Sequence, residues 1–564
     1  MLLPRASVVF CFFATFTLVY SNSKVVRYRK WAEEHPDAFV NQETADESLQ
    51  FSSKPQIEAS SGSVWPMPQL MQVQENRVFL SADTFEFSFS MHDCDTLQSA
   101  FKRYYHIIFD GHLDTKLKFS PRVEKQESNC VLPSCDTAEN TMLEGLVVEL
   151  DTPCEKYPSL ESNETYTLNV KSPTAKLSAS SIWGALRGKS VISIVFMMHV
   201  SFEIQETKKM LIEIVSNYFI TLLQSLDAMA YNKFNVFHWH IVDDQSFPYQ
   251  SAAFPNLNVK GAFPPYYHHS YTQEDVAIVI EYARQRGIRV VAEFDSPGHS
   301  QSWGLSQKDL LTPCYSSGKP DGSFGPINPI LNSTYDFLKK FFGEVVTVFP
   351  DHYVHLGGDE VSFTCWKSNP DITAFMKKMG YGDDYSKLES YYIQRLLDIM
   401  KSLKAGYLVW QEVFDNGVKV ATDTVIHTWK GGYTDELGKI TKAGYKTVLS
   451  SPWYLNYISD PYDEPWKNYY KIDPQNFSGS QAQKDLVMGG EACMWGEYVD
   501  GTNLIQRLWP NAAAIGERLW SSADTTDFNA AAPRLVEQRC RMVKRGLQAE
   551  PVSGPGYCKY EYSP

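Results

Sequence analysis

The C-terminal part of the chain repeats one pattern, in which an apolar, β-rich run is followed by polar residues and then by a helical pattern. Helical patterns lie, for example, at 275–285 and 388–403. Runs that are apolar throughout, instead of alternating, are typical of parallel strands that helices cover on both faces. Eight such runs predict an α/β fold built on a (β/α)8 barrel. The runs are Met210–Val215, Phe234–Ile241, Ile288–Asp295, Tyr353–Glu360, Gly406–Val413, Thr424–Trp429, Lys446–Tyr454 and Leu486–Glu497.

A smaller α+β domain is expected before the barrel. Short alternating runs at Phe85–Ser90, Leu146–Leu150 and Tyr166–Val170 have the period of half-buried strands. The predicted segments are a signal peptide at 1–23, a polar N-terminal segment at 24–63, an α+β domain at 64–205 and the catalytic barrel at 206–564.

The first 23 residues have the pattern of a secretory signal peptide. Arg5 supplies a positive charge, residues 8–20 form an apolar stretch too short to span a bilayer, and residues 21–23 are small and polar. No later stretch reaches about 18 apolar residues. The longest that is worth noting, Val191–Val200, is expected to be buried core. We therefore expect a protein of the secretory pathway, lysosomal or extracellular, that is not embedded in a membrane.

Cysteines and sequons agree with export. Nine of the ten cysteines lie beyond the signal peptide, where disulfides can form, but their spacing does not fix the pairing. An odd number leaves at least one thiol free. The Asn-x-Ser/Thr sequons at Asn163, Asn332 and Asn476 predict glycosylation sites.

The net charge is −14, from 52 Lys+Arg against 66 Asp+Glu. This balance argues against a nucleic-acid partner, because such proteins normally carry a basic face. Aromatic residues make up 14 % of the chain, which suits a carbohydrate site but also a large core. Composition alone favours the large core.

Polar and aromatic side chains follow the ends of the predicted barrel strands. Because barrel enzymes act at the C-terminal ends of their strands, these side chains should meet at one mouth. Carboxylates, a histidine and a ring of aromatics together predict acid/base chemistry on a flat-faced, polyhydroxylated ligand. The residues are His240, Asp243, Asp295, His299, Asp359, Glu360, Trp410, Trp429, Trp453, Tyr454, Trp495 and Glu497.

Asp359 and Glu360 are the sharpest signal among them. Burial and a neighbouring like charge raise the pKa of a carboxyl, which lets it donate a proton near or below neutral pH. The alternative is that Asp359 caps the following helix and Glu360 pairs with a surface cation. Two glycines and the end of a parallel barrel strand precede the pair, and this position favours the catalytic interpretation.

His238 and His240 have the i, i+2 spacing of a metal site on one strand face. A metal-dependent hydrolase would need further ligands at later strand ends, where the sequence offers only His299 and His427. Core histidines that are hydrogen-bonded inside the barrel are therefore favoured, and we predict neither a metal nor a cofactor. Cys493 is expected to be a buried, inert thiol.

Five motifs closely resemble the family-20 glycoside hydrolases and, within them, the animal lysosomal-type β-N-acetylhexosaminidases of the α/β-subunit kind. The resemblance extends from about Val64–Gln69, through Trp183–Gly188, to the C-terminus, with one break. The motifs are NVFHWHIVDDQSFP (Asn235–Pro248), AEFDSPGHS (Ala292–Ser300), HLGGDEV (His355–Val361), VWQEVFDN (Val409–Asn416) and GGEACMWGEYVD (Gly489–Asp500).

The resemblance implies retaining hydrolysis of terminal, non-reducing β-linked N-acetylglucosamine or N-acetylgalactosamine from glycoconjugates or chitin oligomers. The nucleophile in this family is the 2-acetamido oxygen of the substrate itself. By matching motifs, Glu360 would be the general acid/base and Asp359 would hold the acetamido N–H. Asp243 and His299 would form a hydrogen-bonded relay to Glu360.

The same matching assigns the substrate-binding residues. Trp410, Trp429 and Trp495 would enclose the acetamido group and the sugar ring. Tyr454 would hydrogen-bond the acetamido carbonyl, and Glu497 would bind the outer hydroxyls.

Asn456 lies where related subunits differ in their preference for neutral or charged substrates. The next residue is Tyr457 and not a cation, which favours neutral glycans.

Disulfides and partners are also implied by the resemblance. The implied pairs are Cys94–Cys154, Cys314–Cys365 and Cys540–Cys558, with Cys130–Cys135 available as an extra pair and Cys493 left as the odd thiol. Relatives are dimers, so a homodimer or a heterodimer with a related subunit is expected.

The stretch Lys189–Ser225 departs from the family pattern. The family carries there an arginine that grips the sugar hydroxyls, whereas the nearest cation in this chain is Lys209. Lysine is a point charge and an imperfect replacement for the guanidinium fork. Either this is a diverged paralogue, which could bind glycans with weakened or lost hydrolysis, or the stretch is a faulty translation across an exon boundary. Sequencing the transcript across it distinguishes the two.

Overall fold

The computed structural model describes residues 57, 59–60, 62–74, 78–109, 142–192, 199–204, 209–215, 219–263, 269–457, 464–554, 556 and 558. The predicted signal peptide and most of the polar segment 24–63 lie outside these residues, as do Cys130 and Cys135. The middle of the apolar stretch Val191–Val200 lies outside them too. Among the described residues, no helix is both long enough and apolar enough to cross a membrane.

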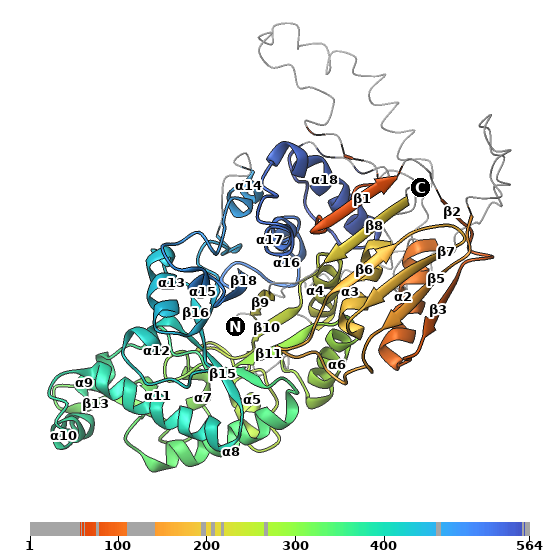
Figure 1. The fold of residues 1–564 in the computed structure, drawn as a ribbon. Helices are drawn as coiled ribbons and strands as arrows, with labels where there is room; N and C mark the ends of the chain where they lie inside the picture. The colour runs from red at the N-terminus through yellow and green to blue at the C-terminus, as the bar shows by residue number, and fades with distance from the viewer. Residues whose placement is uncertain are drawn as a thin grey trace, which may run out of the picture. The chain divides into compact units, whose positions relative to one another are not determined.

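All eight predicted runs are strands of one closed parallel barrel, in the order β10-β11-β14-β15-β16-β17-β18-β9 (Figure 1). The prediction of a (β/α)8 barrel is therefore confirmed. Every residue of β10, β11 and β15 is buried, as expected for strands with helices outside and side chains within. The strands are β9 (Lys209–Val215), β10 (Val236–His240), β11 (Arg289–Glu293), β14 (Tyr353–His355), β15 (Gly406–Trp410), β16 (Val425–Thr428), β17 (Lys446–Leu449) and β18 (Val487–Met494).

Seven of the eight strands end earlier than their apolar runs do, and this corrects the predicted boundaries, whereas β9 ends at Val215 as its run does. The run Tyr353–Glu360 contributes only Tyr353–His355 to β14. Gly357 and Gly358 follow with φ of +70° and +96°, a conformation that turns the chain out of the sheet. Asp359 and Glu360 therefore lie on a loop at the mouth of the barrel.

Helices follow most of the barrel strands. The predicted helix at 275–285 is α6, whose capping box between Thr272 and Asp275 satisfies orphan donors of its first turn. The predicted helix at 388–403 is α11. The helices from the first barrel connection onward are α4 (Phe219–Tyr231), α5 (Asn256–Gly261), α6 (Gln273–Arg284), α7 (Gln301–Gly304), α8 (Asn332–Val348), α9 (Thr364–Ser368), α10 (Pro370–Met379), α11 (Tyr385–Ser402), α12 (Gln411–Asp415), α13 (Tyr433–Lys442), α14 (Pro465–Tyr470), α15 (Gln481–Lys484), α16 (Leu504–Leu508), α17 (Asn511–Trp520) and α18 (Phe528–Lys544).

A hairpin that the sequence analysis did not predict lies after α7. It pairs β12 (Leu311–Ser316) with β13 (Lys319–Ile327), and the disulfide Cys314–Cys365 joins it to α9. A bulge interrupts the pairing. This hairpin is not an apolar run followed by a helical pattern, so the repeat that predicts the barrel strands does not predict it.

The smaller domain is a six-stranded sheet in the order β1-β8-β6-β7-β5-β3. The prediction of an α+β domain before the barrel is thus confirmed. β3, β5 and β7 are parallel, and the remaining pairs are antiparallel. Helix α3 packs against β6 and β7 and also against α4 of the barrel. The elements are β1 (Leu70–Gln74), β2 (Phe79–Leu80), β3 (Glu86–Ser90), α2 (Asp95–Phe109), β4 (Met142–Leu143), β5 (Gly145–Leu150), β6 (Tyr166–Asn169), β7 (Thr174–Ala179), α3 (Ile182–Ile192) and β8 (His199–Ile204).

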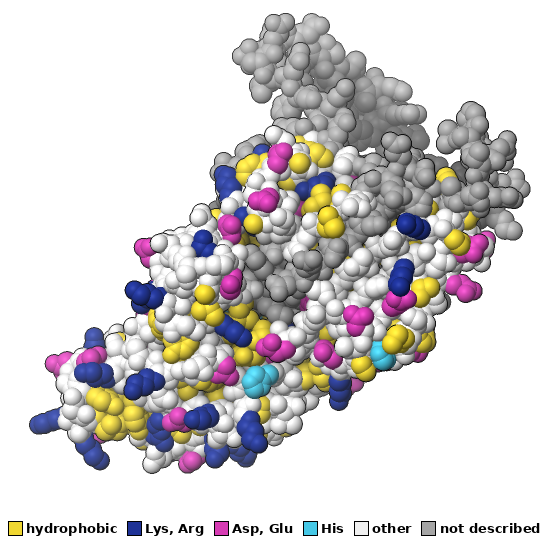
Figure 2. All heavy atoms as spheres, viewed as in Figure 1, with side chains coloured by type: hydrophobic (Ala, Val, Ile, Leu, Met, Phe, Trp, Pro, Cys, Tyr) yellow, Lys and Arg dark blue, Asp and Glu magenta, His cyan; other side chains and the backbone are white. Residues whose placement is uncertain are grey.

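The chain passes from this sheet to the barrel between β8 and β9. We propose that the two domains divide there, at residue 205, as the sequence predicts. On the face shown in Figure 2, basic and acidic side chains are mixed.

The guanidinium of Arg187 forms a buried ion pair and also connects the smaller domain to the barrel. Arg187 of α3 pairs with Glu164, with 2.9 Å between Nε and Oε2, and both side chains are almost fully buried. The same guanidinium donates to the backbone carbonyls of Arg286 and Gly287, just before β11. One side chain therefore satisfies acceptors in both domains.

We predict that Arg187→Ala lowers the free energy of unfolding by about 3–5 kcal/mol, because it leaves the Glu164 carboxylate buried without its guanidinium. Denaturant unfolding followed by far-UV circular dichroism measures this loss. Lys176→Ala, in β7 of the same domain, is the matched control. It breaks the exposed pair Lys176–Glu149 and should cost less than about 1 kcal/mol. Equal losses in the two variants would contradict the prediction.

Candidate active site

The loop after β14 presents two adjacent carboxylates in different surroundings. Asp359 is buried, whereas the side chain of Glu360 is 59 % exposed. Glu360 has φ of +47°, so the backbone turns sharply at this residue. A Cβ at Gly357 would lie 1.6 Å from Oδ1 of Asp295, so no other residue fits there. The glycines before the pair are thus a condition for this geometry.

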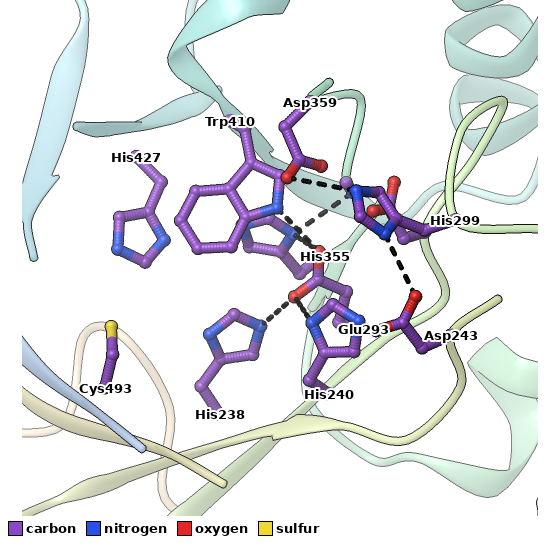
Figure 3. A network of polar contacts seen from close by, with 12 residues as sticks. His238, His240, Asp243, Glu293, His299, His355, Asp359, Trp410, His427 and Cys493 are labelled. Carbon is purple, nitrogen blue, oxygen red and sulfur yellow. Dashed lines mark hydrogen bonds and ion pairs between the residues drawn. The ribbon is translucent and has the colours of Figure 1, made fainter. Parts of the chain in front are cut away.

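The imidazole of His299 faces three carboxylates, those of Asp243, Asp359 and Glu360. Figure 3 shows it between Asp243 and Asp359. Its Nδ1 is 3.0 Å from Oδ1 of Asp243. Its Nε2 is 3.7 Å from Oδ2 of Asp359 and 3.6 Å from Oε2 of Glu360. The structure therefore brings together the four predicted catalytic residues, with an ion-pair separation and not a hydrogen bond between His299 and Glu360.

The carboxylates around His299 favour its protonated, imidazolium form. Burial alone would lower the pKa of His299, but the hydrogen bond to Asp243 and the charge of Asp359 raise it to about 9. Burial opposes ionisation of Asp243 as well, and the bond to His299 still holds the pKa of Asp243 below its ordinary value. His299 and Asp243 thus form a charged pair at neutral pH.

The carboxyl of Asp295 lies beside that of Asp359, with an oxygen within 4.8 Å of a carboxyl oxygen of Asp359. Burial, with the negative charges of Asp359 and Glu293, raises the pKa of Asp295 well above its ordinary value. Its carboxyl is therefore protonated and can donate a hydrogen bond to Asp359. Burial raises the pKa of Asp359 to about 7, against the opposing charge of His299. The sequence analysis placed Asp295 at the mouth but gave it no role.

Four rings follow one another around the mouth, from Trp410 to Trp429, Tyr454 and Trp495. Successive centroids are 6.3, 6.5 and 6.5 Å apart, and the last pair is stacked. We call these four rings the aromatic series. The indole N–H of Trp429 donates to Oε2 of Glu412 at 2.9 Å, a partner that the sequence analysis missed although it lies in the motif with Trp410.

The remaining predicted binding residues lie at the outer end of the aromatic series. Glu497 is exposed on the loop after β18. Asn456 is half-buried, and its Oδ1 makes no hydrogen bond within the described residues. Tyr457, beside it, is 68 % exposed and stacks on Tyr454 with centroids 5.6 Å apart. Lys209 is the first residue of β9, whose side chains lie outside the description.

Beneath the mouth, the core holds buried histidines and carboxylates. His238 and His240 are fully buried and lie 2.8 and 3.0 Å from Oε2 of Glu293. This agrees with the interpretation of His238 and His240 as core histidines. The sequence analysis missed Glu293, although it precedes Asp295 by two residues in a quoted motif. Nitrogen and oxygen atoms that could hold a metal come within 4.8 Å of one another in five groups of the described residues, among them His238, Glu293 and His355.

The described part of the chain contains the disulfides Cys94–Cys154, Cys314–Cys365 and Cys540–Cys558, the pairs that the resemblance implies. Among the described cysteines, Cys493 is buried and takes part in none of these disulfides. The sequon asparagines are all exposed, as attachment of a glycan requires: Asn163, Asn332 and Asn476.

This arrangement can carry out acid/base chemistry beside a flat-faced ligand. An accessible carboxyl, Glu360, can exchange a proton with bound substrate, and buried Asp359 can accept a hydrogen bond from it. A cation, His299, lies within 4 Å of both carboxyls, and the aromatic series offers apolar faces to a sugar ring.

Two sequence families match the chain. Residues 217–523 match the catalytic domain of glycosyl hydrolase family 20, and residues 64–190 match the domain described as beta-acetyl hexosaminidase like. Neither match includes residues 191–216, which fall within the departure found in the sequence. The family match also covers most of the barrel.

Curated relatives are similar over nearly their whole length. Beta-hexosaminidase subunit beta of Felis catus is 49 % identical over 524 residues, with 89 % of this chain and 95 % of the relative covered. Subunit alpha of Bos taurus is 48 % identical over 524 residues, with 89 % and 96 % covered.

Among solved structures, the chitobiase of Flavobacterium johnsoniae matches with a TM-score of 0.72 and 26 % identity, covering 86 % of this chain and 73 % of that one. An exo beta-N-acetylglucosaminidase of Vibrio harveyi matches with a TM-score of 0.70, covering 89 % and 80 % of the two chains. At 20 % identity this second match shows the fold alone.

We predict that Asp243→Asn lowers the pKa of His299 from about 9 towards its ordinary value, because the imidazolium loses its charged acceptor. Titration of selectively labelled histidines by NMR measures this, with His299→Gln to assign the resonance. Asp244→Asn is the neighbouring control. It removes a nearby charge but leaves the bond to His299, so a smaller shift is expected. An unchanged pKa in Asp243→Asn would show that the bond does not control this histidine.

Proposed function

The chain belongs to glycosyl hydrolase family 20, and we propose that it removes terminal N-acetylhexosamines by a retaining, substrate-assisted mechanism with Glu360 as its acid/base. It is an exo-β-N-acetylhexosaminidase, given its similarity to beta-hexosaminidase subunits over nearly their whole length. The substrates are terminal, non-reducing β-linked N-acetylglucosamine and N-acetylgalactosamine on glycoconjugates or chitin oligomers.

In the first step, the 2-acetamido carbonyl oxygen of the substrate attacks its own C1. The bond from C1 to the leaving oxygen breaks, and the protonated carboxyl of Glu360 gives its proton to that oxygen. The product is an oxazolinium ion, whose positive charge is spread over the former acetamido group. The exposure of Glu360 suits a residue that must reach a leaving group of variable size.

Asp359 holds the acetamido group during this step. The developing positive charge makes the N–H a stronger donor, so a buried carboxylate acceptor binds it more tightly in the transition state than in the ground state. Asp295, with its proton, orients the carboxylate of Asp359. The different burial of Asp359 and Glu360 lets them approach one sugar from different sides.

In the second step, Glu360 acts as a base. Its carboxylate takes a proton from water as the water oxygen attacks C1, which opens the oxazolinium and restores the acetamido group with retention at C1. His299, whose pKa is raised to about 9, is a cation 3.6 Å from Glu360 during this step. Asp243 keeps His299 in place and charged.

The aromatic series binds the sugar itself. Trp410, Trp429 and Trp495 would enclose the acetamido group and the apolar faces of the ring, with the hydroxyl of Tyr454 on the acetamido carbonyl. Glu497 and Asn456, at the outer end of the series, would bind hydroxyl groups. The observation that carries the proposal is the pairing of buried Asp359 with accessible Glu360 around one imidazolium.

The sequence around β9 differs from the family pattern, so one alternative function also requires a test. In this alternative the protein binds glycans but hydrolyses them weakly or not at all. β9 closes the barrel between β18 and β10, as the first strand of an active barrel would. The family arginine is nevertheless missing from the sequence there, and an altered strand would reduce binding of the sugar hydroxyls before it affected acid/base chemistry.

We also propose that the chain associates with a second copy of itself or with a related subunit, because its relatives carry the name subunit. Sedimentation velocity tests this, and a monomer at physiological concentration would contradict it. The signal-peptide pattern supports entry into the secretory pathway, with the lysosome or the exterior as destination. Immunolocalisation in the source cells would decide between these two.

We predict that Glu360→Gln lowers turnover of an aryl β-N-acetylglucosaminide at mildly acidic pH by roughly 100-fold or more, because the variant cannot donate the proton. Release of the aryl alcohol measures turnover. Glu274→Gln, which alters an exposed carboxylate of α6, is the control and should retain full activity. Wild-type protein that binds N-acetylglucosamine without turnover would favour the glycan-binding alternative.

We predict that the wild-type protein prefers neutral over sulfated aryl N-acetylglucosaminides, and that Tyr457→Arg raises the relative kcat/KM for the sulfated substrate several-fold. The exposed position of Tyr457 allows a cation there to attract the sulfate, an effect of about 1 kcal/mol at a solvated site. The ratio of the two kcat/KM values measures it. Tyr457→Phe is the control, since it adds no charge, and an unchanged ratio in Tyr457→Arg would refute the idea.

A further inference from the structure

One buried carboxylate, Glu293, lies beneath the mouth of the barrel and takes part in none of the proposed chemical steps. It is the last residue of β11 and has no exposed surface. Its Oε2 faces Nε2 of His238 at 2.8 Å and Nδ1 of His240 at 3.0 Å (Figure 3). A carboxylate in this position is costly to bury unless its oxygens are hydrogen-bonded, so these contacts are a condition for its presence.

The other oxygen of Glu293 faces the aromatic series. The indole N–H of Trp410 donates to Oε1 at 2.8 Å, and Nδ1 of His355 lies 3.0 Å from the same oxygen. Burial opposes its ionisation, but the charges of His240 and His355 and the bonds from the histidines lower the pKa of Glu293 well below its ordinary value. Glu293 is therefore an anion at neutral pH.

Both ends of the aromatic series are connected to the Glu293 carboxylate, one directly and the other through His240. Trp410, at one end, is hydrogen-bonded to it directly. Trp495, at the other end, packs edge-on against the ring of His240 with centroids 5.0 Å apart, and His240 lies against Glu293. An indole needs only one good hydrogen bond to fix its rotation, so the direction of the Trp410 ring depends on Glu293.

We propose that Glu293 is a positioning residue that fixes both ends of the aromatic series, Trp410 directly and Trp495 through His240, and so shapes the site that grips the acetamido sugar. The inference rests on the proposed function for the identity of that sugar. Glu293 acts only through the rings, because it is fully buried and its carboxylate oxygens contact Trp410 and the histidines. Its loss should therefore weaken binding of the sugar as well as turnover.

Glu293→Gln tests the proposal. Glutamine has nearly the same shape but offers one weaker acceptor and an N–H2 that cannot accept from either partner. We expect the dissociation constant of N-acetylglucosamine, measured by calorimetry, to rise roughly tenfold or more, since a hydrogen bond to a charged group is lost. We expect kcat/KM for the aryl substrate to fall roughly 100-fold, since displaced walls misplace the reacting atoms.

Trp410→Phe supplies the second arm of a double-mutant cycle. Phenylalanine keeps a ring at this position but has no N–H for Glu293. If Glu293 acts through Trp410, the effect of Glu293→Gln on binding will be much smaller in the Trp410→Phe background than in the wild type. Additive effects would overturn the proposal, because a loss of folding stability alone predicts them.

Glu517→Gln is the matched control. Glu517 is an equally buried carboxylate of α17 that pairs with Arg534 and accepts from Tyr470, away from the aromatic series. This variant should lose stability and yet bind N-acetylglucosamine as the wild type does. If Glu293→Gln behaves in the same way, the proposal is wrong.

If Glu293→Gln does not fold, Trp410→Phe alone still decides, because an unchanged dissociation constant in that variant would overturn the proposal. The binding measurement is also independent of turnover. A wild-type protein that binds the sugar and does not hydrolyse it would refute the proposed function and leave the inference about Glu293 to be judged by the same cycle.

Discussion

The closure of eight parallel strands into one barrel is the constraint on which the site depends. Parallel strands in a closed sheet all end on the same rim, so loops from distant parts of the sequence must meet there. Asp243 follows β10 and His299 follows β11, yet their side chains are in contact because these strands are neighbours. The chemistry therefore requires no insertion or extra domain, only short loops on a rim that the strands already define.

A barrel of this kind is also filled with side chains, and here part of that filling is polar. Glu293 and its histidines replace apolar layers directly beneath the mouth. An apolar core would pack as densely but could not orient an indole through a directed bond. The polar layer thus joins the stability of the barrel to the shape of the site, since the bonds that make burial of Glu293 tolerable also hold Trp410.

Two carboxylates next to each other in the sequence take up different tasks because their surroundings differ. Asp359 is buried beside protonated Asp295, and Glu360 is solvated. The difference arises from a backbone turn with positive φ at Gly357, Gly358 and Glu360. Burial and backbone conformation, and not residue type, therefore distinguish the two carboxyls, and the proposed mechanism assigns them different roles on that basis.

The sequence determined the fold class and indicated which carboxylates and aromatics would gather at the mouth, because both follow from local patterns. Apolar runs showed the eight strands, and strand ends showed where carboxylates and aromatics would gather. Only the tertiary structure decided where the strands end and that β12 and β13 form a hairpin. It alone also supports the proposed role of Glu293. A hydrogen bond between Glu293 and Trp410 joins strands 117 residues apart in the chain, and no local pattern encodes which buried acceptor a distant indole will meet. Distances, burial and the pKa values that depend on them exist only once the barrel has closed.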